Sequence, residues 1–186
     1  MQGKTSATVI LGCACPVGPT SEHAMPLSLA LDALGGSFKS RLMATVRERE
    51  GLSYGINSSS TLSDPSTTVV YVIGTFAPSL LERGVRLTKQ LVSEWRRDSI
   101  TAEELDIAKS RAIGSARVAW NTPSNLANSL HASRLHFQSP AARCKSLPDR
   151  VRAVTLDDCK NALNALPPFE EWVCVCAGGI PANHTM

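Results

Sequence analysis

Two hydrophobic periods divide the chain into strands and helices. Strand-like apolar runs occupy residues 5–12, 52–60, 67–77 and 170–179, and the third has the continuous apolar centre of a central strand. Apolar residues three and four apart predict helices over 22–34 and 40–50, and further helices that begin near 78, 101, 122 and 155. This order predicts an α+β fold in which helices cover one face of a largely antiparallel sheet. Because there is no repeat or linker, residues 1–186 are expected to form a single domain.

Local signals mark several boundaries. Thr101 and Glu104 have the spacing of a capping box, and Thr122-Pro123 supplies an N-cap followed by proline at the first helical position. Gly51 suits the end of helix 40–50 because glycine adopts left-handed dihedral angles without steric cost. Asp-Pro-Ser at 64–66 predicts the turn between two strands. The helix from Thr101 carries a stripe that allows close packing, formed by Leu105, Ala108, Ala112, Ala116 and Ala119.

Composition places the chain among ordinary globular proteins. Its 186 residues are 43% hydrophobic and 19% charged, with a net charge of +3 that gives no indication of nucleic-acid or acidic-membrane binding. Apolar runs such as Val69 to Ile73 are far shorter than the roughly 20 residues that span a bilayer, so no membrane span is predicted. The strand-like run follows the first residues almost directly, which is compatible with a fragment or one half of a larger protein. The sequence does not determine a compartment.

Cysteines occur as two Cys-x-Cys pairs, Cys13 with Cys15 and Cys174 with Cys176. In a strand this spacing places both thiols on one face, so four sulfur atoms on adjoining strands could form a zinc site. Structural zinc ligands usually have two to four residues between cysteines, and free cysteine is often buried. Core packing is therefore the favoured interpretation.

Self-contained catalytic motifs are missing from the sequence. Gly3-Lys4-Thr5 matches only the end of a phosphate-binding loop and precedes a strand instead of a helix. No His-x-x-Glu-His or Gly-x-Ser-x-Gly motif occurs, and His131 and His136 are five apart on a predicted helix, so they do not share a face. By its own groups the chain lacks a complete catalytic site.

Residues 31–60, LDALGGSFKSRLMATVREREGLSYGINSSS, carry the most specific pattern. An apolar helix ends in Leu-Gly-Gly, a Ser-Arg-Leu helix follows, and Arg47-Glu48 leads through Gly51-Leu52 to Tyr54-Gly55. This pattern resembles the second-half signature of the M16 family of zinc metallopeptidases, which includes pitrilysin, insulin-degrading enzyme and mitochondrial processing peptidase. Residues 100–115 and 151–158 resemble later markers of that family.

The resemblance implies an enzyme built from two similar halves that enclose a chamber. One half carries zinc on His-x-x-Glu-His and a distal glutamate, and this sequence matches the other half, which has no metal site. Arg47 would hold a carbonyl group of the peptide substrate, and Tyr54 would support the tetrahedral intermediate over the zinc of the partner half. Such groups act by hydrogen bonding at about 3 Å and need not exchange a proton. The chain is therefore expected to be inactive alone and to need a zinc-bearing half on the same or another polypeptide.

Structural interpretations remain beside these roles. Arg47 could pair with Glu50 or a neighbouring carboxylate, and Tyr54 could pack under the helix with its hydroxyl at the surface. Arg41 is expected to pair with a carboxylate. The basic side chains of the helix from Pro78 are expected to form a solvated face, with a chamber wall for acidic substrates as the alternative: Arg83, Arg86, Lys89, Arg96 and Arg97. The alternative function is a catalytically inert scaffolding subunit with the same fold.

Overall fold

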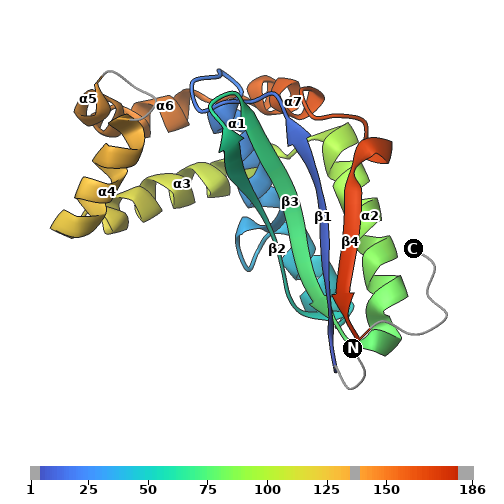
Figure 1. Ribbon diagram of the computed structural model, residues 1–186. Coiled ribbons are helices and arrows are strands. Elements are labelled where there is room, and N and C mark those ends of the chain that lie inside the picture. Colours follow the sequence, from blue (N-terminus) through green and yellow to red (C-terminus); the bar gives the residue numbers. More distant parts are fainter. Residues whose placement is uncertain (1–4, 135–138, 180–186) are drawn as a thin grey trace.

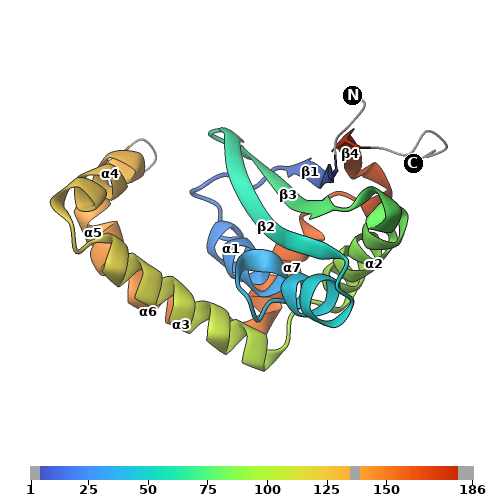
Figure 2. The same cartoon turned by 90° about the horizontal axis from the view of Figure 1, so that it is seen from below.

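The computed structural model describes residues 5–134 and 139–179. Its sheet has four antiparallel strands in the order β2-β3-β1-β4. The strands are β1 (Ala7–Cys15), β2 (Ser53–Asp64), β3 (Thr67–Phe76) and β4 (Val173–Gly178). In Figures 1 and 2 the helices α1, α2 and α7 lie against one face of this sheet. The α+β fold with an antiparallel sheet and helices is confirmed.

The helices follow the predicted order, with more segments near the C-terminus. They are α1 (Ala24–Leu31), α2 (Leu81–Asp98), α3 (Ala102–Ala119), α4 (Pro123–Arg134), α5 (Pro140–Lys145), α6 (Leu147–Ala153) and α7 (Leu156–Asn164). Two π-helical segments, η1 (Asp32–Gly36) and η2 (Met43–Arg49), complete the predicted helices 22–34 and 40–50. Short 3₁₀ turns occur at η3 (Pro78–Leu80) and η4 (Phe169–Glu171). The helices α5 and α6 were not predicted.

Two strands extend beyond their predicted ends because their backbones find pairing partners there. β1 continues to Cys15, which lies opposite Thr68 of β3, and does not stop at residue 12. β2 continues to Asp64 instead of ending at residue 60. The predicted Asp-Pro-Ser turn is confirmed, and the carboxylate of Asp64 accepts a hydrogen bond from the backbone N–H of Ser66 at 2.8 Å.

The hydrophobic core lies between the inner face of the sheet and helices α1, α2 and α7. β3 contributes the buried Val70, Val72 and Phe76, and α2 contributes Trp95, whose side chain is fully buried. Gly84 of α2 packs directly on Phe76, because a Cβ atom at position 84 would lie 2.3 Å from the ring. A glycine is thus required where α2 crosses the end of β3.

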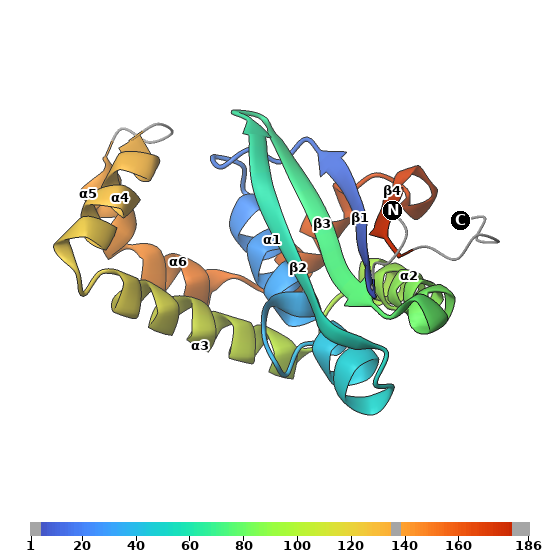
Figure 3. The ribbon, with the colours of Figure 1, turned by 60° about the horizontal axis from the view of Figure 1, so that its bottom comes forward.

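The helices α3 to α6 form an arm that projects from the sheet and its helices (Figures 2 and 3). We call residues 107–134 and 139–153 the helical arm. Of the predicted stripe on α3, Leu105 and Ala108 are buried, whereas Ala112, Ala116 and Ala119 are half-buried. The expected close packing therefore holds only at the start of α3, because the rest of this helix leaves the body of the domain.

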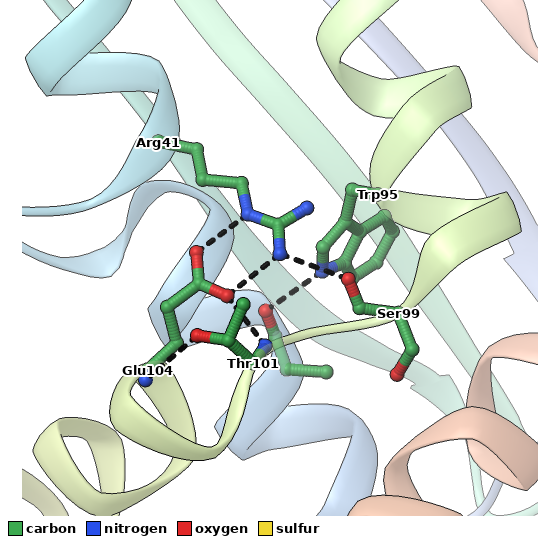
Figure 4. A network of polar contacts seen from close by, with 6 residues as sticks. Arg41, Trp95, Ser99, Thr101 and Glu104 are labelled. Atoms are coloured by element: carbon green, nitrogen blue, oxygen red, sulfur yellow. Dashed lines mark hydrogen bonds and ion pairs between the residues drawn. The ribbon is translucent and has the colours of Figure 1, made fainter.

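A polar network joins α3 to the segment that precedes η2 (Figure 4). The guanidinium of Arg41 donates two hydrogen bonds to the Glu104 carboxylate, at 2.5 and 2.6 Å, and one to the carbonyl of Ser99 at 2.9 Å. Glu104 also accepts from the backbone N–H of Thr101, which completes the predicted capping box. The expected pairing of Arg41 with a carboxylate is confirmed, and it fixes the base of the helix that carries Arg47.

The Glu104→Gln variant is expected to lower the free energy of unfolding by about 1–3 kcal/mol at pH 7, the range for hydrogen bonds to a charged group. Burial raises the pKa of Glu104, but hydrogen bonds from Arg41 and Thr101 outweigh it and hold this pKa below the ordinary value. A lowered pKa contributes stability above the ordinary value of about 4.3, and this stability is lost as the pH falls through the folded-state pKa. The difference between variant and wild type should therefore shrink below about pH 4.

Urea unfolding at a series of pH values measures this difference. Glu103→Gln is the matched control, because Glu103 is an exposed neighbour on the same helix. A Glu104→Gln effect no larger than that of the control at pH 7 would contradict a stabilising role for the network.

Candidate functional site

Arg47 and Tyr54 are placed by a helix end and the strand that follows it. The helix ends at Gly51, which has a φ of 61° as predicted for a left-handed C′ residue. The backbone N–H of Leu52 returns to the carbonyl of Val46, at 2.9 Å, and closes the turn. Arg47 therefore lies in the last turn of η2, one tight turn away from Tyr54 at the start of β2.

A β-bulge turns Tyr54 outward. The register of β2 on β3 shifts between Ser53 and Gly55, so Tyr54 is the extra residue on its strand. The buried hydroxyl of Ser53 lies 2.7 Å from the carbonyl oxygen of Thr75 and 2.8 Å from that of Gly55, and accepts from the Gly55 N–H at 3.2 Å. Bulges often re-aim side chains near active sites. Here the result is a tyrosine side chain that is 90% exposed.

The Arg47 side chain is held from two sides. Its guanidinium carbon lies 5.5 Å from the centroid of the Phe38 ring, within the range of a cation–π interaction. Its Nε lies 3.6 Å from the carboxylate of Glu48. The Phe38 ring forms an apolar wall beside the guanidinium, although this side chain is 75% exposed.

Both predicted residues line one cavity of about 510 Å³. The cavity lies between η1, η2 and the start of β2, and its lining comprises Gly35, Gly36, Ser37, Phe38, Met43, Arg47, Tyr54, Gly55, Ile56, Asn57 and Arg111. At Gly55 a Cβ atom would meet nothing within 4 Å, so the strand backbone is open to a ligand at that point. A cavity with apolar walls and a few polar groups is typical of ligand sites.

Arg111 of α3 adds a second cation to this cavity. Its Nη1 lies 2.7 Å from the Asp32 carboxylate and also contacts the carbonyl of Gly36. Burial raises the pKa of Asp32, although the neighbouring charge of Arg111 opposes this shift. Asp32 is not part of the lining, so the charged groups that face the cavity are arginines.

The structure decides between several interpretations from the sequence. Arg47 has a neighbouring carboxylate in Glu48, whereas Glu50 pairs with Arg83. The structural alternative, in which Tyr54 packs under the helix, is wrong, because the bulge exposes its ring. Ser53 and Arg111 were not singled out as site residues, since their contacts with Thr75 and Asp32 join distant segments. Phe38 was missed although its partner Arg47 lies in the same local segment.

Cysteine packing follows the favoured interpretation. Cys13 and Cys15 are buried in the core, and burial raises the pKa of Cys13 to about 12. Cys174 lies opposite Leu11 and Cys176 opposite Val9, and both pack against the core. Within residues 5–134 and 139–179, no group of three or more His, Cys, Asp or Glu side chains could hold a metal ion. Gly3, Lys4 and His136 lie outside the described residues.

The basic face of α2 is less uniform than expected. Arg83 pairs with Glu50, and Arg97 pairs with Asp98. Arg96 is half-buried and donates to the carbonyl of Leu166 at 2.9 Å, so this arginine joins α2 to the segment after α7 and is not simply solvated.

Among the helices of the described residues, none is long and apolar enough to cross a membrane.

Comparison with known proteins agrees with this geometry. Residues 2–112 match the family model described as the peptidase M16 inactive domain. The chain belongs to the M16 inactive-domain family. An uncharacterized zinc protease of Mycobacterium tuberculosis is 33% identical over 130 residues, which cover 69% of this chain and 29% of that protein. A non-peptidase homolog of Helicobacter pylori is 27% identical over 139 residues, which cover 71% of this chain and 30% of that protein.

Solved structures share the fold of this M16 inactive domain. A peptidase M16 inactive domain from Pseudomonas fluorescens superimposes with a TM-score of 0.84 at 23% identity, covering 97% of this chain and 42% of that chain. The inactive peptidase domain of a putative zinc protease from Bordetella parapertussis gives a TM-score of 0.79 at 15% identity and 97% coverage of both chains. The M16 inactive domain described here spans less than a third of the length of the two curated relatives named above.

Proposed function

We propose that this M16 inactive domain is the substrate-binding, non-catalytic half of an M16-type zinc metallopeptidase. It completes a peptide-binding chamber together with a second half that holds the zinc ion. The observation that carries the proposal is the convergence of Arg47 and Tyr54 on one cavity, although they belong to different elements. The two Cys-x-Cys pairs lie in or against the core, so the proposal assigns the zinc to the second half.

The two side chains can perform complementary tasks on a bound peptide. Peptide hydrolysis places negative charge on the carbonyl oxygen, and preorganised donors in a water-poor site stabilise that charge. The exposed phenol hydroxyl of Tyr54 can donate to this oxygen, and the Arg47 guanidinium can hold a carbonyl of the substrate backbone. The Phe38 ring and Glu48 restrict the guanidinium before substrate arrives, which reduces the entropy lost on binding. Zinc in the second half would supply the Lewis-acid chemistry of hydrolysis.

A second candidate function is a scaffolding subunit that does not take part in peptide hydrolysis. The similarity to a non-peptidase homolog of Helicobacter pylori favours it. This function requires the fold and its surfaces but not the donor groups at the cavity. Substitutions of Arg47 and Tyr54 therefore separate the two functions.

Arg47→Ala in the assembled enzyme is expected to raise KM and to lower kcat/KM by about 10- to 100-fold, as for a lost charge-assisted hydrogen bond of roughly 1.5–3 kcal/mol. The rise in KM follows because a carbonyl clamp acts on bound substrate before the reaction as well as during it. Steady-state kinetics on a peptide substrate measures both parameters.

Arg49→Ala is the matched control, because Arg49 lies two residues further on the same helix, is exposed and does not line the cavity. The control should leave KM and kcat unchanged. Equal effects of the two substitutions, or no effect of either, would favour the scaffolding function.

A further inference from the structure

The helical arm has a strongly one-sided charge. Residues 107–148, which make up most of the arm, contain six of the 19 Lys and Arg residues of the chain and none of its 16 Asp and Glu residues, and Asp149 is the one acidic residue in the rest of the arm. The small net charge of the whole chain conceals this asymmetry, since the remaining sequence has more acidic than basic residues. Single-sign regions attract surfaces of opposite charge and speed their association.

The arm also lacks a covering layer among the described residues. In Figures 2 and 3 the outer part of α3 and the helix α4 extend away from the sheet. Val118 is 71% exposed and Leu126 is 37% exposed, and residues 121–128 are exposed along their whole length. A helical arm with so little burial gains little stability from its own packing, which favours a partner that covers it.

A groove of about 580 Å³ runs along α3 where it faces α6. Its lining comprises Asp106, Lys109, Ser110, Ile113, Gly114, Arg117 and Arg152. Gly114 is unusual there, because glycine in the middle of a helix costs about 1 kcal/mol relative to alanine. A Cβ atom at Gly114 would meet nothing within 4 Å, so the packing of this chain does not require the glycine. A partner that approaches the helix backbone closely would require it.

Two of the three cations in this groove, Lys109 and Arg117, have no carboxylate partner among the described residues. Lys109 donates a hydrogen bond to the carbonyl of Arg152 at 3.0 Å. Arg152 pairs with Asp149 on α6. Arg117 is exposed and makes no hydrogen bond or ion pair with the residues that the structure describes. Asp106 is the one acidic residue of the lining, and it immediately precedes the helical arm on α3.

We propose that this α3 groove docks an acidic segment of the zinc-bearing half, with an apolar side chain placed over Gly114 and carboxylates paired with Lys109 and Arg117. The inference rests on the proposed function, because it takes the second half as the partner. The surplus of cations in residues 107–148 supports an acidic occupant. The length of the curated relatives supports a partner from the same protein family, because most of each relative lies outside the region matched by this chain.

Two other partners fit the groove less well. Clusters that bind acidic membranes contain about 4–8 Lys and Arg residues close together, whereas here six are spread over 42 residues. A nucleic-acid backbone needs phosphate contacts and gains nothing from the aliphatic side chain of Ile113 in the groove lining. Both partners are included as outcomes of the test.

Calorimetric titration of this chain with the zinc-bearing half, at low and high salt, tests the inference. The double variant Lys109→Glu with Arg117→Glu should raise Kd by at least about tenfold and reduce the salt dependence. The control is the double variant Arg86→Glu with Lys89→Glu. It changes the net charge by the same amount, but on α2, and should leave Kd nearly unchanged.

Gly114 provides a test that a loss of folding cannot imitate. Gly114→Ala and Gly114→Leu should both raise Tm, by about 2–4 °C, because each improves helix propensity. Only Gly114→Leu fills the groove, so it should raise Kd by at least about tenfold while Gly114→Ala has a much smaller effect. A variant that is more stable and yet binds more weakly identifies a contact surface.

Several results would overturn the inference. These are an unchanged Kd for Gly114→Leu, equal effects of the two charge reversals, and no complex between the halves. Binding of phosphatidylserine vesicles or of a single-stranded RNA, lost in the Lys109/Arg117 variant while the complex of halves persists, would assign the groove to that ligand. The proposed function is tested separately by the KM of Arg47→Ala. A complex of the two halves whose Kd is unchanged by the groove variants would therefore refute only the docking site.

Discussion

Tyr54→Phe is expected to lower kcat of the assembled peptidase by about 10- to 1,000-fold, the range for removing one oxyanion donor, with little change in KM. The hydroxyl interacts with charge that develops only in the transition state, so its loss does not weaken substrate binding. The ring is 90% exposed, and removing one oxygen from it should not change the free energy of unfolding. Steady-state kinetics and thermal unfolding of the same preparation measure both quantities.

Tyr71→Phe is the control for this substitution. Tyr71 lies on β3 opposite Gly12 and Ser59 and does not line the cavity. It should leave kcat unchanged. If Tyr54→Phe also leaves kcat per assembled complex unchanged, Tyr54 does not support the transition state. The scaffolding function is then better supported than the substrate-binding one.

Trp95→Ala is expected to destabilise the domain by about 3–5 kcal/mol, the range for truncating a buried aromatic side chain. Trp95 is fully buried, and its indole N–H donates to the carbonyl of Ala30 at 3.0 Å, so it joins α2 to α1 (Figure 4). For a domain of this size the change corresponds to a fall in Tm of roughly 6–20 °C.

Trp120→Ala serves as the comparison, because Trp120 is only half-buried at the end of α3. Its truncation should cost much less than that of Trp95. Similar falls in Tm for the two variants would show that the outer part of α3 is as tightly packed as the core, against the description of a projecting arm.

Local signals in the sequence were sufficient to place Arg47 and Tyr54. Gly51 marked the end of the helix, and its left-handed conformation makes the tight turn into β2. The helix period before this glycine and the strand pattern after it placed the two residues on adjoining elements. Their approach to a common site therefore follows from interactions within about ten residues of chain.

The shape of the site depends on contacts that no local pattern encodes. The bulge that exposes Tyr54 requires Ser53 to bond with Thr75, which lies 22 residues further along the chain. Arg111 reaches the cavity from α3 through its pairing with Asp32. Such contacts depend on tertiary packing, and so the cavity was not foreseen although its two central residues were.

The arm shows a similar limit of sequence periodicity. The regular stripe on α3 predicted burial along the helix, but Ala112, Ala116 and Ala119 are only half-buried. A hydrophobic stripe indicates which face of a helix is apolar, and it does not indicate whether the covering partner belongs to the same chain.

Peptide hydrolysis by the separate and combined halves tests the central claim most directly. This chain alone should contain substoichiometric zinc by elemental analysis and cleave no peptide, and adding it to the zinc-bearing half should produce activity that Tyr54→Phe in this chain greatly reduces. Hydrolysis by this chain alone with one tightly bound zinc, or activity of the zinc-bearing half that does not depend on this chain, would contradict the account.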